Sequence, residues 1–294
     1  MTASGNLGLP EAIDIGLLRQ WVGRQEDSED VATLFPVRAL QATLEAPYVG
    51  EIVAGDALPP LWHWLYFLPL HPWSALGADG HARKGGFLPP VPLPRRMWAG
   101  GRFEFSGPLR IGDRMRKLST ITAVRASEGR SGPLVFVTVR HEISVAGERR
   151  IAEEHDIVYR RAPAPGDVPV APVPAETGEW RCEVLPDDVL LFRYSALTFN
   201  GHRIHYDRRY ATEVEGYPGL VVHGPLIATL LLDLLQRKTP EPRLASFRFR
   251  AIRPTFDTTP FFVNGRRAAD GREIRLWASD GDGWLTMEAT ATLA

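Results

Sequence analysis

The chain of 294 residues contains a single cysteine, Cys182, which excludes a disulfide within the chain and a multi-cysteine zinc site. This low cysteine content is typical of a reducing compartment. Neither sign of charge is in excess, since the formal net charge is −1 at pH 7. The overall charge therefore predicts no binding to nucleic acid or to a membrane surface.

A hydrophobic run long enough to span a bilayer is also missing. The most apolar stretch, PGLVVHGPLIATLLLDLL, is short and is interrupted by His223 and Asp233. The N-terminal residues MTASGNLGLPEAIDIG show no basic region followed by an apolar run, so no signal peptide is expected. With 44% hydrophobic and 23% charged residues, the composition is that of a globular protein, which we expect in the cytoplasm.

A proline-rich segment divides the chain. Residues 161–180 contain repeated prolines and no periodic apolar pattern, which predicts an extended connector and excludes a helix or a central strand. The segment separates an N-terminal unit, residues 1–160, from a C-terminal unit, residues 181–294. Each unit is large enough to form a domain.

The two units share a layout in which one apolar, helix-like segment precedes a run of alternating strands. The helix candidates are ALPPLWHWLYFLP at 57–69 and HGPLIATLLLDLLQRK at 223–238. A turn is expected at 106–108, and the Ala-Gly pair at 146–147 indicates a hairpin. A helix that is apolar on nearly all sides needs cover on most of its surface. We therefore expect an α+β fold in which a curved antiparallel sheet wraps each helix and the two sheets pair edge to edge.

Chemistry-bearing residues gather in FNGHRIHYDRRYA, residues 199–211. Residues 190–198 before it have the spacing of a strand or a short helix, and the Asn-Gly pair that starts at Asn200 ends that element. The motif VVHG then leads into the helix predicted at 223–238. A helix N-terminus offers free backbone N–H groups and a partial positive charge, so the N–H of Gly224 is a candidate to polarise a carbonyl oxygen.

His205 can exchange a proton near neutral pH, and Asn200 can hold a water molecule against it. Other roles are open for His205 and for the neighbouring histidines His202 and His223. Taken alone, His205 could be a surface histidine in a loop, and His202 could position the segment instead of binding a ligand. His223 is expected to cap the helix. A metal site built from these three histidines is not expected, because no carboxylate pattern accompanies them.

Two basic stretches in the N-terminal unit, RKGGF at 83–87 and PRRM at 94–97, are either solvated loops or contacts for phosphate groups. The aromatic residues between 62 and 67 are expected in the core.

The motifs resemble those of the MaoC-like, (R)-specific enoyl-CoA hydratases, a family with the hotdog fold. That family carries Asp-x-Asn-Pro-Leu/Ile-His, and here Asn200 falls on the aspartate, His202 on the asparagine and His205 on the histidine. The VVHG motif at 221–224 matches the His-Gly that opens the hotdog helix. The resemblance is close over residues 194–235 and extends to the rest of the chain by layout.

The stretch from Arg95 to Asp113 is similar to a subgroup of 3-hydroxyacyl-thioester dehydratases and hydratases of mesaconyl-C4-CoA and itaconyl-CoA. This resemblance implies a double hotdog whose C-terminal unit adds water to, or removes it from, an acyl thioester with a short, branched or dicarboxylic acyl group. The N-terminal unit shows no Asn/His pair at matching spacing, so it would be non-catalytic and would widen the acyl pocket. Coenzyme A or acyl carrier protein would carry the acyl group, a homodimer is compatible with the fold, and no metal or cofactor is implied.

The resemblance also implies roles for individual residues. Asn200 would orient water, His205 would act as general base and acid, and the N–H of Gly224 would bind the thioester oxygen. Five further residues are expected to contact the substrate: His202, Tyr194, His223, Arg95 and Arg96.

One departure from the family concerns the proton transfer. Asn200 stands where the family has a carboxylate, and an amide can only form hydrogen bonds. Either His205 carries more of the proton transfer, or His202 or Asp207 supplies a second titratable group. Two other functions fit the same sequence, namely a hotdog thioesterase and a non-catalytic acyl-CoA binding protein.

Overall fold

The computed structural model describes residues 13–46, 50–129, 132–162, 171–239 and 243–294. The segment expected as a linker, 161–180, lies partly outside the described residues, and so does the N-terminal stretch considered for a signal peptide. The division into units of residues 1–160 and 181–294 stays a prediction.

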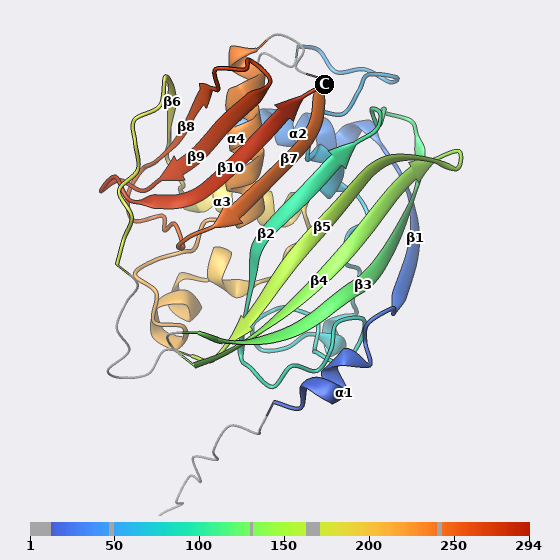
Figure 1. Ribbon diagram of the computed structural model, residues 1–294, viewed down its shortest axis with the longest axis vertical. Coiled ribbons are helices and arrows are strands. Elements are labelled where there is room, and N and C mark those ends of the chain that lie inside the picture. Colours follow the sequence, from blue (N-terminus) through green and yellow to red (C-terminus); the bar gives the residue numbers. More distant parts are fainter. Residues whose placement is uncertain (1–12, 47–49, 130–131, 163–170, 240–242) are drawn as a thin grey trace, which may run out of the picture.

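Ten strands within the described ranges form one antiparallel sheet in the order β1-β3-β4-β5-β2-β7-β10-β9-β8-β6 (Figure 1). The first half of the chain supplies β1 (Gln25–Val31), β2 (Arg95–Phe105), β3 (Arg114–Gly129), β4 (Gly132–Val145) and β5 (Glu148–Arg160). The second half supplies β6 (Trp180–Val184), β7 (Leu244–Ala251), β8 (Phe261–Arg267), β9 (Glu273–Ser279) and β10 (Leu285–Leu293). The expected turn at 106–108 and the hairpin at 146–147 lie between strands as predicted.

The pairing of β2 with β7 joins the two halves edge to edge, as the sequence predicted. Residues 100–104 run antiparallel to residues 246–250, with Phe103 directly opposite Phe247. Both rings are 1% exposed, and Phe249 packs beside them. The junction is therefore part of the hydrophobic core as well as a row of backbone hydrogen bonds.

The helix predicted for the C-terminal half is confirmed as α4, Gly224–Lys238. Pro225 lies in its first turn, and Arg237 and Lys238 lie in its last turn, where cations complement the helix dipole. The residues from Leu226 to Leu235 are all buried, and the helix packs against β6, β8, β9 and β10. No helix among the described residues is long and apolar enough to cross a bilayer.

The prediction of a helix at 57–69 is wrong. That segment contains only a 3-10 turn, η2 (Trp62–Leu65), because prolines precede it and Leu61 and Phe67 adopt positive φ angles of 68° and 54° on either side. Its aromatic residues are nevertheless in the core as predicted, with Trp62 and Tyr66 buried.

The helix that the sequence analysis missed in the first half is α2, Leu34–Leu44. It buries Val37, Leu40 and Leu44 at helical spacing and packs against η2 and α3 (Asp188–Leu197). The segment predicted as a strand or short helix at 190–198 is thus a helix. A short helix, α1 (Ile15–Arg19), packs against β3.

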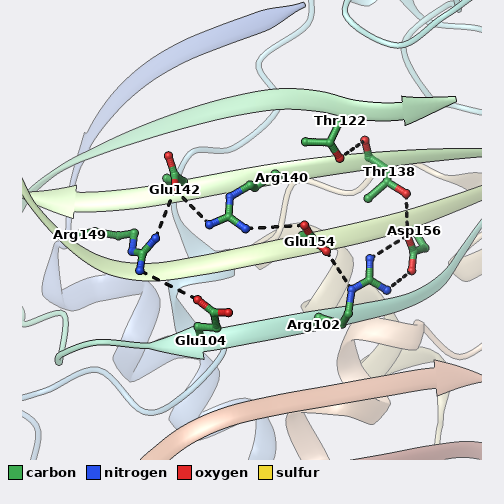
Figure 2. Close-up of polar contacts among 9 residues, drawn as sticks. All are labelled: Arg102, Glu104, Thr122, Thr138, Arg140, Glu142, Arg149, Glu154 and Asp156. Atoms are coloured by element: carbon green, nitrogen blue, oxygen red, sulfur yellow. Dashed lines mark hydrogen bonds and ion pairs between the residues drawn. The ribbon is translucent and has the colours of Figure 1, made fainter. Parts of the chain in front are cut away.

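The outer face of the first half of the sheet carries a network of ion pairs and hydrogen bonds (Figure 2). Arg102 pairs with Glu154 and Asp156, and Arg140 pairs with Glu142 and Glu154. Because side chains alternate along a strand, the residues between them point to the opposite, concave face. That face, which the helices cover, holds buried residues such as Phe103 and Glu153.

Replacing Phe247 by alanine tests the junction. We expect a loss of about 3–5 kcal/mol in the free energy of unfolding, because the change empties a buried site shared by both halves. Phe35→Ala is the control, since its ring is 77% exposed and should contribute within about 0.5 kcal/mol. Denaturant unfolding of both variants measures the difference, and equal values would contradict a core at the junction.

Candidate active site

The segment predicted to carry the chemistry lies between α3 and the N-terminus of α4. The Asn200 N–H bonds to Ser195 O at 2.8 Å as α3 ends, and the Asn200 Oδ1 accepts the N–H of His202 at 3.0 Å. This local hydrogen bond fixes the asparagine in a turn and uses one of the two lone pairs of its oxygen. The side-chain N–H groups of Asn200 remain available to bind a ligand. That Asn200 orients a water molecule stays a prediction, in which the amide N–H donates to the water.

His205 is held in one tautomer. It ends a 3-10 turn, η4 (Arg203–His205), and its Nδ1 lies 2.6 Å from Val221 O. A carbonyl oxygen only accepts, so Nδ1 carries the proton and Nε2 is free to accept one. The ring is 8% exposed, which excludes the alternative of a surface histidine in a loop.

His223 packs against His205 instead of capping α4 through its side chain. The two rings stack with centroids 3.8 Å apart and planes 18° apart, and α4 shows no side-chain cap at His223. His223 occupies the N-cap position of α4, as predicted, and its carbonyl oxygen accepts the N–H of Ile227 at 3.1 Å, but its side chain takes no part in the cap. His223 Nε2 lies 2.8 Å from Ser195 Oγ, and Tyr194 packs edge-on at 5.0 Å. Tyr194 is 2% exposed and packs against His223. Its contact with the substrate stays a prediction, and its position suits a residue that supports the His223 ring.

Burial keeps these histidines neutral. It lowers the pKa of His205 to about 4, although the Val221 carbonyl opposes the shift. Burial and the neighbouring rings hold the pKa of His223 and of His202 far below the ordinary value. At pH 7 the stacked pair therefore carries no like charges, and His205 is in its basic form.

A loop from the first half of the chain, residues 77–81, docks on this segment. The backbones cross at Gly80 and Gly201, where a Cβ on Gly80 would lie 1.8 Å from Gly201 O. Gly80 also has a φ of +87°, which favours glycine. Arg203 donates its N–H to Asp79 O at 2.9 Å and its Nη1 to Ala78 O at 3.0 Å. The first half thus forms one wall of the site.

That loop brings Asp79 and His81 to the motif, and the sequence analysis missed both residues. The His81 ring centroid is 4.1 Å from that of His202, which in turn is 5.4 Å from that of His205. The only sequence signal was the Asp-Gly-His triplet just before RKGGF, and nothing in its spacing indicates a contact about 120 residues away, with His202.

The two arginines predicted to bind substrate differ in their surroundings. Arg95 Nε lies 3.0 Å from Glu215 Oε2, and its guanidinium stacks over Tyr217. The charge of Arg95 is therefore already paired within the protein. Arg96 has no carboxylate within ion-pair distance among the described residues. Burial lowers the pKa of His81 and of His202, and the charge of Arg96 adds to this, so Arg96 lies within electrostatic range of both rings.

In the part of the chain that the structure describes, two groups of side chains have ligand atoms close enough to share a cation, all within 4.8 Å of one another. They are Asp79, His81 and His202, and separately His141, Glu153 and His155. In both, a histidine nitrogen already faces a carboxylate oxygen, at 3.1 Å in the first group and 3.2 Å in the second. Glu153 Oε2 also lies 2.9 Å from His63 Nε2, in the interior of the first half. Both groups are hydrogen-bonded or ion-paired clusters.

Solved structures share this architecture. A MaoC-like dehydratase superposes with a TM-score of 0.68 at 16% identity, covering 94% of this chain and 99% of its own. HtdX of Mycobacterium tuberculosis has a TM-score of 0.65 at 17% identity, covering 92% and 100%. A further M. tuberculosis protein, described as having a double hotdog fold, has a TM-score of 0.56 at 14% identity, covering 92% and 96%. The fold is the double hotdog that the sequence predicted.

The chain belongs to the hydroxyacyl-thioester dehydratase type 2 family, whose model matches residues 61–257. It is 50% identical over 275 residues to mesaconyl-C(4)-CoA hydratase of Chloroflexus aurantiacus, covering 93% of this chain and 96% of the relative. It is 27% identical over 267 residues to the mitochondrial hydroxyacyl-thioester dehydratase type 2 of Schizosaccharomyces pombe, covering 80% and 88%. The predicted class, a hydro-lyase acting on acyl thioesters, is confirmed.

The low pKa of His205 predicts the pH dependence of hydration. A base acts only when it is unprotonated, so kcat/KM should stay high as pH falls through 6.5 and should drop only near pH 4. The measurement is kcat/KM between pH 3.5 and 8, accompanied by circular dichroism to confirm that the protein stays folded. An acid limb near pH 6.5 would contradict a buried His205 acting as the base.

Proposed function

We propose that this protein adds water reversibly across the α,β double bond of an enoyl-CoA whose acyl group is a short unsaturated dicarboxylic acid of the mesaconyl type. The observation that carries the proposal is the buried, neutral His205, whose Nδ1 is fixed by Val221 O beside the N-terminus of α4. The 50% identity to a mesaconyl-C(4)-CoA hydratase supports the acyl class. Coenzyme A is the carrier in this proposal, the cytoplasm is the location, and a homodimer is the assembly.

The residues of the motif divide the hydration step among them. His205 Nε2 accepts a proton from water as the water oxygen bonds to the β-carbon, and the Asn200 amide holds that water. Negative charge then develops on the thioester oxygen, and the N–H of Gly224 donates a hydrogen bond to that oxygen at the positive end of α4. A Cβ on Gly224 would meet nothing nearer than the Met287 methyl at 4.0 Å, so a thioester can approach this backbone.

The acyl group of this proposal explains the position of Arg96. In a mesaconyl-C4 thioester the free carboxylate is attached to the carbon that water attacks, so the cation that binds it must lie beside the catalytic histidine. Arg96 lies within electrostatic range of His81 and His202, and no carboxylate is within ion-pair distance of it among the described residues. A guanidinium binds a carboxylate through two parallel hydrogen bonds. The neutral Asn200 also avoids the repulsion that an aspartate would exert on such a substrate.

The contacts of the other residues support a role for each of them in this proposal. Arg95 holds β2 to the turn at 215–217 through Glu215 and Tyr217, so it supports its neighbour Arg96. His202 lines the site between His81 and His205. His223 fixes the plane of the His205 ring. The first half of the chain widens the acyl pocket in this proposal.

The first test follows the loss of the enoyl-thioester absorbance with crotonyl-CoA, a medium-chain enoyl-CoA, mesaconyl-C4-CoA and itaconyl-CoA. We expect turnover of the mesaconyl thioester and a loss of about 10²- to 10⁴-fold in kcat for His205→Ala. His71→Ala is the control, because His71 is exposed. Release of free thiol with no hydration would favour the thioesterase, and tight binding without turnover would favour the non-catalytic binding protein.

Replacing Arg96 by methionine tests the dicarboxylic substrate. We expect KM for mesaconyl-C4-CoA to rise about 10- to 100-fold, the loss of one charge-assisted pair, while KM for crotonyl-CoA changes little because crotonyl lacks the distal carboxylate. Arg209→Met is the control, since Arg209 is 83% exposed. An equal rise for both substrates would place Arg96 on the coenzyme A phosphates instead.

A further inference from the structure

Hydration moves two protons at two different atoms. Water loses one as its oxygen bonds to the β-carbon, and the α-carbon gains one. The motif from the second half of the chain offers one clear proton acceptor, His205. Asn200 cannot exchange a proton, and His202 lies between the other rings with a pKa far below its ordinary value. Asp207 is engaged by Arg203 at 2.7 Å and by the N–H of Tyr210 at 3.0 Å. The second proton-transfer group has to come from elsewhere in the fold.

The loop from the first half supplies a titratable pair at this place. Asp79 holds His81 with both carboxylate oxygens, since Oδ2 lies 3.1 Å from His81 Nδ1 and Oδ1 accepts the His81 N–H at 3.1 Å. With Nδ1 bound to the carboxylate, Nε2 is the ring nitrogen left for other partners. A carboxylate placed this way fixes the tautomer and orientation of an imidazole and stabilises its protonated form.

The surroundings of His81 suit contact with a ligand. Its side chain is 24% exposed, whereas His205 is 8% exposed, so the His81 ring is open to a ligand beside the rings of His202 and His205. The Gly80–Gly201 crossing fixes the loop against the motif, so His81 is not a mobile surface group. The family model, which matches residues 61–257, includes both the loop and the motif.

We propose that His81, oriented by Asp79, is the second proton-transfer residue of this site and exchanges the proton at the α-carbon, so that each half of the chain contributes one catalytic histidine. This inference rests on the proposed hydratase function. It assigns the carboxylate that Asn200 lacks to Asp79, which acts through His81 as a positioning residue. It also revises the expectation that the N-terminal unit is non-catalytic.

The proton balance closes with these groups. In hydration, His205 Nε2 takes a proton from water while the oxygen forms its bond to the β-carbon. The electron pair of the double bond moves onto the thioester as an enolate, and protonated His81 then delivers its Nε2 proton to the α-carbon. Solvent takes the proton from His205 and returns one to His81. In dehydration neutral His81 removes the α-proton, and protonated His205 delivers its proton to the leaving hydroxyl.

The charges around His81 set the direction of its pKa shift. The titratable and charged groups that face it are Asp79 on its own loop, Arg96 on β2, and His202 and His205 from the second half. Burial and Arg96 lower the pKa of His81, and Asp79 raises it. Removing the Asp79 charge must therefore lower this pKa further, and any limb of the pH profile that belongs to His81 must move to lower pH.

The decisive variant is His81→Gln, whose amide can still donate to Asp79 but cannot titrate. We expect kcat for hydration to fall about 10²- to 10⁴-fold with KM nearly unchanged, and added imidazole to restore part of the activity of His81→Ala. His71→Gln is the matched control, an exposed histidine that precedes the same loop. A kcat for His81→Gln within about threefold of wild type, or an effect on KM alone, would overturn the proposal.

Asp79→Asn provides a second measurement that does not depend on His81→Gln folding. We expect the alkaline limb of kcat for hydration to move to lower pH, because the protonated form of His81 loses its carboxylate partner. An unmoved limb would reduce Asp79 and His81 to a purely structural role. If the wild type hydrates none of the thioesters, the proposed function itself fails. If the wild type is active and His81→Gln is equally active, only this inference fails.

Discussion

The pairing of β2 with β7 is the constraint on which the rest of this structure depends. It makes one ten-stranded sheet from the two halves and buries Phe103 against Phe247 at the junction. Because β2 also carries Arg96, the same pairing brings a cation of the first half toward the second. The loop at 77–81 then lies on the segment at 200–203, and the site is formed from both halves of the chain.

Burial determines the chemistry that the histidines of the site can perform. A solvated imidazole would be partly protonated at neutral pH, but removal from water keeps His205 and His223 neutral and lets their rings stack. The neutral rings also leave the positive end of α4 and the Arg96 guanidinium as the groups that attract negative charge. In the proposed mechanism, Asp79 orients His81 for the second proton transfer, so no carboxylate is needed at Asn200.

The parts of the site that are local in sequence could be predicted, and the parts that depend on contacts between the halves could not. Gly224 at the start of α4 and His205 beside it follow from a helix with a clear apolar pattern and from two motifs close together. His81 gave no such signal, since its neighbour His202 lies in the other half. In the fold, the apolar composition of residues 57–69 favours a helix that their prolines prevent. The helix α2 gives a weak sequence signal, because only Val37, Leu40 and Leu44 of its residues are buried.

The crossing of Gly80 and Gly201 has a consequence for how this sequence can vary. Neither glycine has a side chain to offer a substrate, yet any side chain at Gly80 would overlap the carbonyl of the other backbone. In a complete map of single substitutions, Gly80 should appear as intolerant as a catalytic residue, and a change at Gly201 should not rescue it. A diverging lineage could then alter the acyl pocket freely while this small contact between two loops stayed unchanged.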